Sequence, residues 1–447
     1  MQQRPHSPAS SSRRTFIRAT AVLAATGGAA PLLASPLFAP GASTRGLRAR
    51  GHAANERMQL GYIGWGVRSR ETFGGFLDDE GVEIVSVADV AAERARDGVR
   101  RINERRGNGA CSVAASWREI IANPAIDAVV VMTPDHWHAE PAIAAALAGK
   151  HVYCEKPLSL TIAEGRAIAN AARCAGIRFQ TGSQQRSEFG HHFVRAAEAV
   201  RNGRIGRIRR VTIGVGAPPV ACDLPAEECP ADIDWDGWLG QAPARPFSSV
   251  LCPIGVHGNY PAWRNYREYC NGGLADMGAH HFDIAQWALG MDESGPREVI
   301  PPADGAKTGL RFVYASGIEM IHGGPTDCTF FGTEGTIECS RGHVRAYRGE
   351  DPAAADDPAL LEPVRPGETP LPRNRSHIGD FLAAIREGRD PICTAETGHR
   401  TATICQLCNI GYEIGKPLTW DAAAERFTGE HAAAANALTV RAVRPHR

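Results

Sequence analysis

One lysine in this sequence is well placed to do chemistry. Lys156 follows the apolar run Val152-Tyr153-Cys154, which predicts a buried strand, and it stands between Glu155 and Pro157. Open α/β sheets bind their ligands at the carboxyl ends of the strands. A lysine at that edge binds polar groups, or acts as an acid or base once its pKa is depressed. We therefore expect Lys156 at the mouth of a ligand cleft, with Glu155 fixing its position electrostatically.

A predicted helix from Gly272 to about Leu289 carries a second set of ionisable side chains. Asp276, His280 and Asp283 are spaced i, i+4 and i+7, so they share one face of an otherwise apolar helix. Oxidation of an alcohol needs a base for the hydroxyl proton and a neighbour that holds the base. We predict His280 as the acid/base and Asp276 as its orienting partner, with Lys156 completing the catalytic site. Whether Lys156 or His280 takes the proton stays open, and the structural alternative is a helix N-terminal acid with a core histidine.

A glycine-rich turn predicts a nucleotide site. Gly64-Trp65-Gly66-Val67-Arg68 follows the first predicted strand and opens a helix, although serine replaces the third glycine of the usual pattern. Such a backbone approaches a pyrophosphate at the helix N-terminus. Asp89 ends the second strand, where a carboxylate binds ribose hydroxyls and repels a 2′-phosphate, so NAD is favoured over NADP. Arg94 and Arg96 keep NADP as the alternative, and a helix-capping role for Asp89 is compatible with the ribose role.

The third predicted strand leads into a loop that would lie over the same ligand. Thr133, Pro134 and the capping aspartate that follows them bring this loop to the sheet edge. The histidines at positions 136 and 138 are two residues apart and do not share a helix face, so no metal site is expected here. The segment from Asp234 to Trp238 is interpreted as structural.

Alternating strands and helices would position these residues. From Met58 the sequence predicts strands at 59–63, 82–88, 128–132 and 151–154 and around Phe179, with helices between them, as in a doubly wound parallel sheet. Later strands at 208–215, 309–314 and 317–322 indicate a second sheet that is antiparallel or mixed. Loops rich in Pro, Trp and Gly occupy 217–271, and 351–374 predicts a surface loop. We expect an α/β protein.

Composition excludes several classes of partner. The formal net charge is zero and 43% of residues are hydrophobic, which argues against nucleic acid or an anionic membrane as the main partner. The length suggests two domains plus extensions. The twelve cysteines have no disulfide-framework spacing, and Cys405 and Cys408 lie in an apolar run that favours core packing over a redox motif.

The first 57 residues are predicted to be a signal peptide and linker. The stretch Ser12 to Arg18 matches a twin-arginine signal, and a weakly apolar stretch follows to about Phe38. Its glycines and prolines make a poor membrane-spanning helix, so we expect no stable membrane insertion; an uncleaved anchor is the alternative. The expectation is export through the twin-arginine machinery to the periplasm.

The motifs occur in the order and approximate spacing of one family. Gly64-x-Gly66, Thr133-Pro134 with His138, Glu155-Lys156-Pro157 and Gly-Gly-x-x-Asp276-x-x-x-His280 together resemble the glucose–fructose oxidoreductase / inositol dehydrogenase (Gfo/Idh/MocA) superfamily and its exported branch. The resemblance covers about Met58 to Trp420. It implies a Rossmann domain at 58–182, then a larger α/β domain at 183–447 with a mostly antiparallel, open-faced sheet, a C-terminal extension and homo-oligomers (dimer or tetramer). It also implies bound NAD(P), catalysis by Lys156, Asp276 and His280, and sugars, cyclitols or related polyols as substrates.

A polyol substrate suggests further contacts. Aromatic rings stack on sugar C–H surfaces, while arginine and asparagine bind hydroxyls. The predicted substrate-binding residues are Arg186, Trp263, Arg264, Tyr266 and Tyr269. The cofactor is expected to contact Gln185 at its nicotinamide amide, and the residues named above: Gly64, Trp65, Gly66, Val67, Arg68, Asp89, Thr133, Pro134, His138, Glu155 and Lys156.

The sequence thus predicts an NAD-dependent oxidoreductase that acts on a secondary hydroxyl of a sugar, glycoside or cyclitol. Because a periplasm contains little free NAD, the cofactor is expected to be tightly bound and recycled in place. One alternative is an NAD-dependent glycosidase that uses transient oxidation and elimination. Another is a non-catalytic sugar-binding protein on the same fold.

Overall fold

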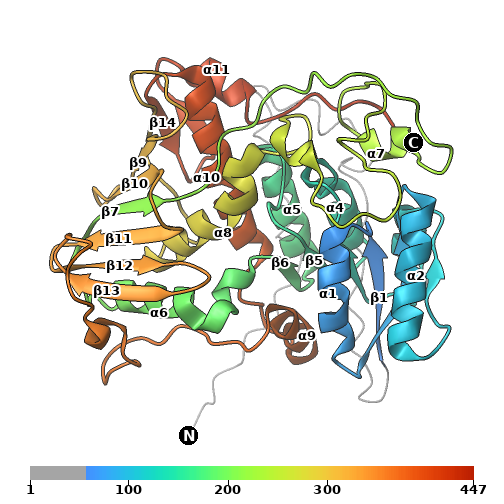
Figure 1. Ribbon diagram of the computed structural model, residues 1–447, viewed down its shortest axis with the longest axis horizontal. Coiled ribbons are helices and arrows are strands. Elements are labelled where there is room, and N and C mark those ends of the chain that lie inside the picture. The colour runs from blue at the N-terminus through green and yellow to red at the C-terminus, as the bar shows by residue number, and fades with distance from the viewer. Residues whose placement is uncertain (1–56, 447) are drawn as a thin grey trace, which may run out of the picture. The chain divides into compact units, whose positions relative to one another are not determined.

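The predicted parallel sheet is present at the beginning of the computed structural model, which describes residues 57–446 (Figure 1). The twin-arginine motif lies outside the described residues. The six strands have the order β3-β2-β1-β4-β5-β6, and every neighbouring pair is parallel. Their bounds are β1 Met58–Ile63, β2 Val82–Ala88, β3 Ser112–Val113, β4 Ala128–Val131, β5 His151–Cys154 and β6 Phe179–Thr181. The short apolar runs became strands because both faces of this sheet are covered by helices.

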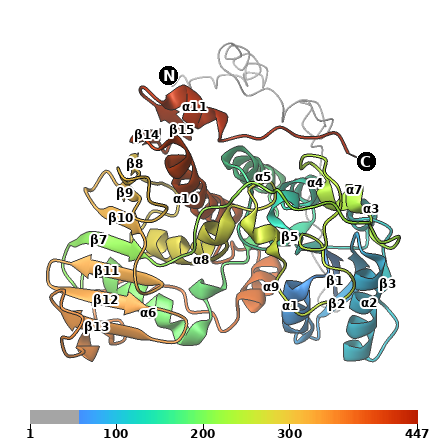
Figure 2. The same cartoon turned by 45° about the horizontal axis from the view of Figure 1, so that its top comes forward.

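Two rows of helices cover the parallel sheet. Side chains of α1 and α2 share one hydrophobic core with β1 and β2, while α3, α4 and α5 lie in a row on the other face (Figure 2). The helices are α1 Val67–Leu77, α2 Ala92–Arg106, α3 Trp117–Ala122, α4 Ala139–Leu147 and α5 Ile162–Ala175. A late helix, α9 (His377–Glu387), adds Phe381 and Leu382 to the first core. That contribution from the far end of the chain was not predicted.

The second half contains a nine-stranded sheet with the order β13-β12-β11-β7-β10-β9-β8-β14-β15. Only the β7–β10 pair is parallel among its neighbours. The expected strand at 309–314 is shorter than predicted, since β9 covers only Arg311–Val313. The other strands are β7 Ile208–Ile213, β8 Glu298–Ile300, β10 Glu319–His322, β11 Cys328–Gly332, β12 Gly335–Cys339, β13 Val344–Arg348, β14 Leu418–Asp421 and β15 Arg426–Thr428.

Helices of the second half bury one face of this sheet. The largest core joins its strands to α6, α8 and α10, and it includes Cys405 and Cys408, as the sequence predicted. All twelve cysteines are free. The helices are α6 His192–Arg201, α7 Trp235–Leu239, α8 Gly272–Ala288, α10 Ala395–Ile414 and α11 Ala432–Ala437. Helix α10 also contacts α5, so it connects the two halves.

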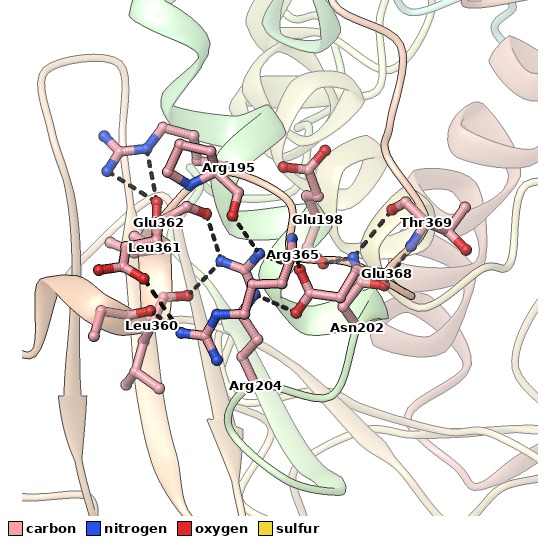
Figure 3. Close-up of polar contacts among 12 residues, drawn as sticks. Arg195, Glu198, Asn202, Arg204, Leu360, Leu361, Glu362, Arg365, Glu368 and Thr369 are labelled. Carbon is pink, nitrogen blue, oxygen red and sulfur yellow. Dashed lines mark hydrogen bonds and ion pairs between the residues drawn. The ribbon is translucent and has the colours of Figure 1, made fainter.

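The segment 351–374 is more firmly held than a surface loop. Leu360 and Leu361 are buried in the core of the second half. Arg204, three residues beyond the end of α6, donates hydrogen bonds to the carbonyl of Leu360 and to the Glu368 carboxylate, as Figure 3 shows. The segment contains the 3-10 helix Pro358–Leu361, which is too short to give a periodic sequence pattern, and hydrogen bonds from side chains fix it to the second half.

Within residues 57–446, no helix is both long enough and apolar enough to cross a bilayer.

Candidate active site

A cavity of about 850 Å³ lies where the carboxyl ends of the parallel strands face helix α8 and the loops of 217–271. Its wall includes the glycine turn after β1, Asp89 after β2, Thr133 after β4 and Lys156 after β5. The position agrees with the rule that open α/β sheets bind ligands at this edge. We refer to this cavity as the cleft.

The glycine turn is shaped to receive a phosphate. Gly64 has φ +88°, and a Cβ there would lie 2.9 Å from the carbonyl oxygen of Met132, so only glycine fits. A Cβ on Gly66 would meet no atom within 4 Å, which leaves the backbone open to a ligand. Gly66 begins α1 without a side-chain cap, and the first turn has no acidic residue. Ser69, in the place of the third glycine, donates its hydroxyl to the Gly64 carbonyl at 2.8 Å and so braces the turn.

Asp89 organises the nucleotide end of the cleft. One carboxylate oxygen accepts the backbone N–H of Trp65 at 2.6 Å, and the other accepts that of Ala91 at 2.8 Å. The carboxylate therefore couples the glycine turn to the start of α2 while it also lines the cleft. Each carboxylate oxygen has a second lone pair for a ribose hydroxyl.

The segment from Asp234 to Trp238, interpreted as structural from the sequence, also contributes to the cleft wall. Ile233 pairs with Ala91 in an isolated bridge, which brings Asp234, Gly237 and Trp238 against the nucleotide end. Sequence reasoning missed this because the contact joins loops more than a hundred residues apart and has no motif of its own.

Arg94 holds a second part of the 217–271 loops in place. Its guanidinium donates to the carbonyls of Gly255 and Pro253, and only 7% of the residue is exposed. Arg70 donates to the carbonyl of His257 in the same stretch. Of the two arginines that kept NADP as an alternative, Arg94 is thus already occupied by protein carbonyls, whereas Arg96 is exposed.

The loop after β4 divides into cleft and support residues. Thr133 and Pro134 line the cleft, and the Thr133 hydroxyl is buried without a partner among the described residues. His138 does not line the cleft. Its ring nitrogens contact the carbonyls of Pro157 and Thr133, at 2.7 and 2.9 Å. We therefore assign His138 to positioning the two loops, because neither nitrogen is left for the cofactor.

Lys156 and Asp276 form the central ion pair of the cleft. The ammonium donates to the Asp276 carboxylate at 2.9 Å and to its backbone carbonyl at 2.7 Å. Arg264 lies 3.6 Å from the same carboxylate. Burial opposes ionisation of Asp276, but Lys156 and Arg264 outweigh it and hold its pKa below the ordinary value. An ammonium has three N–H donors, so one remains for a substrate oxygen.

His280 lies on the cleft wall one turn after Asp276. It is 3% exposed, and within residues 57–446 its Nδ1 has no hydrogen-bond partner. Burial, followed by the charges of Lys156 and Arg341, holds the pKa of His280 well below its ordinary value. The expected orienting bond from Asp276 is not present, because two cations take up that carboxylate. The lowered pKa favours the neutral imidazole, and Nδ1 is its unpaired nitrogen among the described residues.

Glu155 supports the lysine through a network beneath it. Its carboxylate accepts from Arg68 at 3.1 Å and from the Gln184 amide at 3.0 Å. Gln184 lines the cleft, whereas its neighbour Gln185 is fully buried, does not line the cleft, and has no partner for either amide atom among the described residues. The structure thus turns Gln184, not Gln185, toward the cleft.

The predicted substrate residues fall into two groups. Trp263 and Arg264 line the cleft, with the guanidinium 4.2 Å from the indole centroid. Arg186 does not, because it is 1% exposed and ion-paired with Asp283 and Asp292. Tyr266 and Tyr269 also lie outside the cleft wall, and Tyr269 is 1% exposed.

Three cleft residues had no sequence signal. Arg341 comes from the turn between β12 and β13, Phe189 from the turn before α6, and Tyr260 from the 217–271 loops. None belongs to a motif, and only the folded chain brings them into the wall of the cleft.

Comparison with known proteins agrees with this architecture. A family profile described as "Oxidoreductase family, NAD-binding Rossmann fold" matches residues 58–183. A second, "Oxidoreductase family, C-terminal alpha/beta domain", matches residues 220–446. The chain belongs to the Gfo/Idh/MocA oxidoreductase family. The family inferred from the motifs is confirmed, as are the fold class and the NAD-binding Rossmann fold, while the exported branch stays a prediction.

Several relatives within the Gfo/Idh/MocA family are named enzymes. The chain is 30% identical to a 1,5-anhydro-D-fructose reductase of Ensifer adhaerens over 264 residues, which are 59% of this chain and 66% of the reductase. It is 34% identical to a myo-inositol 2-dehydrogenase of Thermotoga maritima over 138 residues, 30% of this chain and 39% of that protein. These matches span less than two thirds of each relative's length.

Solved structures of low sequence identity share the Gfo/Idh/MocA fold. An aldose–aldose oxidoreductase from Caulobacter crescentus, complexed with glycerol, has a TM-score of 0.56 and 20% identity. The likeness covers 81% of this chain and all of the other chain. At that identity the comparison supports the fold, not a substrate.

Proposed function

We propose that the protein is an NAD-dependent oxidoreductase that moves hydride between the cofactor and a secondary hydroxyl carbon of a sugar, glycoside or cyclitol. The observation that carries the proposal is the meeting of Lys156, Asp276 and His280 at the cleft, opposite the glycine turn. The named relatives include sugar and cyclitol reductases and dehydrogenases, which supports the substrate class.

The residues present fit a dinucleotide. The uncapped start of α1 and the open space at Gly66 would hold the pyrophosphate, and Asp89 would hold the ribose. The occupied guanidinium of Arg94 and the negative charge of Asp89 favour NAD over NADP. NAD would supply the acceptor or donor for the hydride. The part of the 217–271 loops that Arg94 and Arg70 hold by hydrogen bonds covers the nucleotide end of the cleft, which supports a tightly held cofactor.

Side chains of this protein would bind the reacting oxygen and move its proton. The free N–H of Lys156 would bind the reacting oxygen and stabilise its negative charge, while Asp276 keeps the ammonium in place. Neutral His280, with an unpaired nitrogen, is suited to accept the hydroxyl proton during oxidation. The two roles are compatible, because a positive neighbour lowers the proton affinity of the hydroxyl.

The test uses the purified full-length protein. Denatured protein would be analysed for released nucleotide, and intact protein would be incubated with sugars, glycosides and cyclitols while reduced-nicotinamide absorbance and product masses are followed. Bound NAD with keto products is the expected result. Bound NAD with free sugar and aglycone, without net reduction, would replace the proposal by a glycosidase. A protein that neither contains nor binds nucleotide would refute both.

We also propose export through the twin-arginine route to the periplasm, on the basis of Arg13 and Arg14 in the predicted signal. Replacing both by lysine should retain the protein in the cytoplasm with its cofactor bound, as fractionation of producing cells would show. Unchanged export would contradict this proposal. The predicted homo-oligomer stays a prediction.

A further inference from the structure

Arg341 differs from the other arginines of the cleft wall. Within residues 57–446 its guanidinium forms no hydrogen bond or ion pair, and Asp327 and Asp276 act on its charge only from a longer range. Its Cζ lies 4.7 Å from the centroid of the Phe189 ring. The four others each bond to a carboxylate or a backbone carbonyl; they are Arg68, Arg94, Arg118 and Arg264.

The position of Arg341 is at the reacting end of the cleft. It sits in the turn between β12, which ends at Cys339, and β13, which begins at Val344, near the edge of the nine-stranded sheet (Figure 1). Its charge, like that of Lys156, acts on His280. Lys156 is already paired with Asp276, whereas no carboxylate in the described part of the chain lies within ion-pair distance of Arg341.

Phe189 gives this cation a fixed support. Its φ of +58° lies in the left-handed region, where the backbone of a bulky residue is strained. Such strain is retained where a side chain must be aimed in one direction, and Phe189 lines the cleft. The ring contact holds the guanidinium at the cleft wall by a cation–π attraction.

We propose that Arg341 binds a carboxylate of the substrate, so that the preferred substrate is an acidic sugar or polyol, such as a uronic acid, rather than a neutral one. A planar guanidinium matches a carboxylate through two parallel hydrogen bonds. A neutral polyol needs no uncompensated cation, since the polar side chains already at the site can bind its hydroxyls. The inference rests on the proposed function, because it concerns the substrate of that same cleft.

The experiment compares matched acid and neutral sugars on the NAD-loaded, full-length protein. D-glucuronate would be set against D-glucose, and D-galacturonate against D-galactose, with kcat/KM from nicotinamide absorbance and Kd from calorimetry. We expect a preference for the acid of at least about tenfold. Arg341→Gln should reduce that preference to about one, mainly through KM, and Arg341→Lys should restore part of it because it keeps the charge but not the planar fork.

The matched control is Arg207→Gln. Arg207 is exposed, does not line the cleft, and has no side-chain partner among the described residues, so this variant should keep the acid preference. Equal use of both sugars by the wild type, or an equal loss for both in Arg341→Gln, would overturn the inference.

Calorimetry separates this inference from the proposed function. If no sugar is turned over by nucleotide-loaded protein, the oxidoreductase assignment fails. D-glucuronate binding that Arg341→Gln weakens would still support the acid site. Absent binding, or binding that this substitution leaves unchanged, would reject it.

Discussion

Helix α8 carries two aspartates seven residues apart, each paired with a cation, and the two pairs serve different ends. In the Lys156–Asp276 pair the side chains are 15% and 29% exposed, and both line the cleft. In the Arg186–Asp283 pair they are 1% and 0% exposed, and a second carboxylate, Asp292, joins them. Similar residues on one helix thus form part of the candidate active site in the Lys156–Asp276 pair and a buried structural contact in the Arg186–Asp283 pair. The difference is access to the cleft.

The largest effect is expected from breaking the buried pair. Arg186→Met leaves Asp283 without its cation in the protein interior, which should lower the free energy of unfolding by about 3–5 kcal/mol. Urea denaturation would measure it. The control, Asp292→Asn, removes a partly exposed carboxylate and should cost less, about 1 kcal/mol. A stable Arg186→Met protein with a raised KM would instead restore Arg186 to the substrate site.

Breaking the cleft pair should affect turnover rather than stability. Lys156→Met removes the donor to the reacting oxygen, so kcat should fall by about 10²–10⁴-fold. The free energy of unfolding should change by no more than about 1 kcal/mol, because the pair is partly solvated. Lys416→Met, at an exposed lysine outside the cleft, is the control. A loss of several kcal/mol in the free energy of unfolding would show that the Lys156–Asp276 pair stabilises the fold as the Arg186–Asp283 pair does.

The pH dependence sharpens the same contrast at His280. Because its pKa is lowered in the folded state, His280 stays neutral below pH 6.5, and kcat/KM for oxidation should remain flat through that pH and decline only in more acidic buffer. Unfolded chains would bind the proton first, so this group favours unfolding as the pH falls below about 6.5. His280→Gln should lower kcat by about 10²-fold. An acidic limb centred at or above pH 6.5 in the wild type would contradict the buried, neutral state.

The smallest effect is expected at Arg94, which is buried like Arg186 but, within residues 57–446, bonds to two backbone carbonyls and the Cys252 sulfur instead of a carboxylate. Arg94→Met should loosen the 217–271 loops over the nucleotide end and raise the Kd for NAD about tenfold, the size expected for one or two lost hydrogen bonds. Dialysis followed by nucleotide analysis would detect it. Arg96→Met, at an exposed residue of the same helix, should retain the cofactor. If both variants retained NAD equally, the 217–271 loops held by Arg94 would not be what holds the nucleotide.

Much of the parallel half could be predicted because its signals are local. Strands such as Val82–Ala88 and His151–Cys154 were predicted with the same bounds, since a buried parallel strand is a short apolar run. Helix α9 was not assigned to that core, because its contact with α1 joins residues some three hundred positions apart.

By itself, the sequence determined the fold class, the family and the residues whose backbone or charge has a local reason: Gly64 in its left-handed turn, Asp89 after its strand, Lys156 at the sheet edge and Asp276 with His280 on one helix face. Tertiary structure alone decided which charges are free. It gave Asp276 to Lys156 rather than to His280, buried Arg186 against Asp283, and left Arg341 at the cleft wall without an ion-pair partner among residues 57–446. The physical reason is that local spacing sets the direction of a side chain, whereas its partner and its exposure depend on segments that only folding brings together.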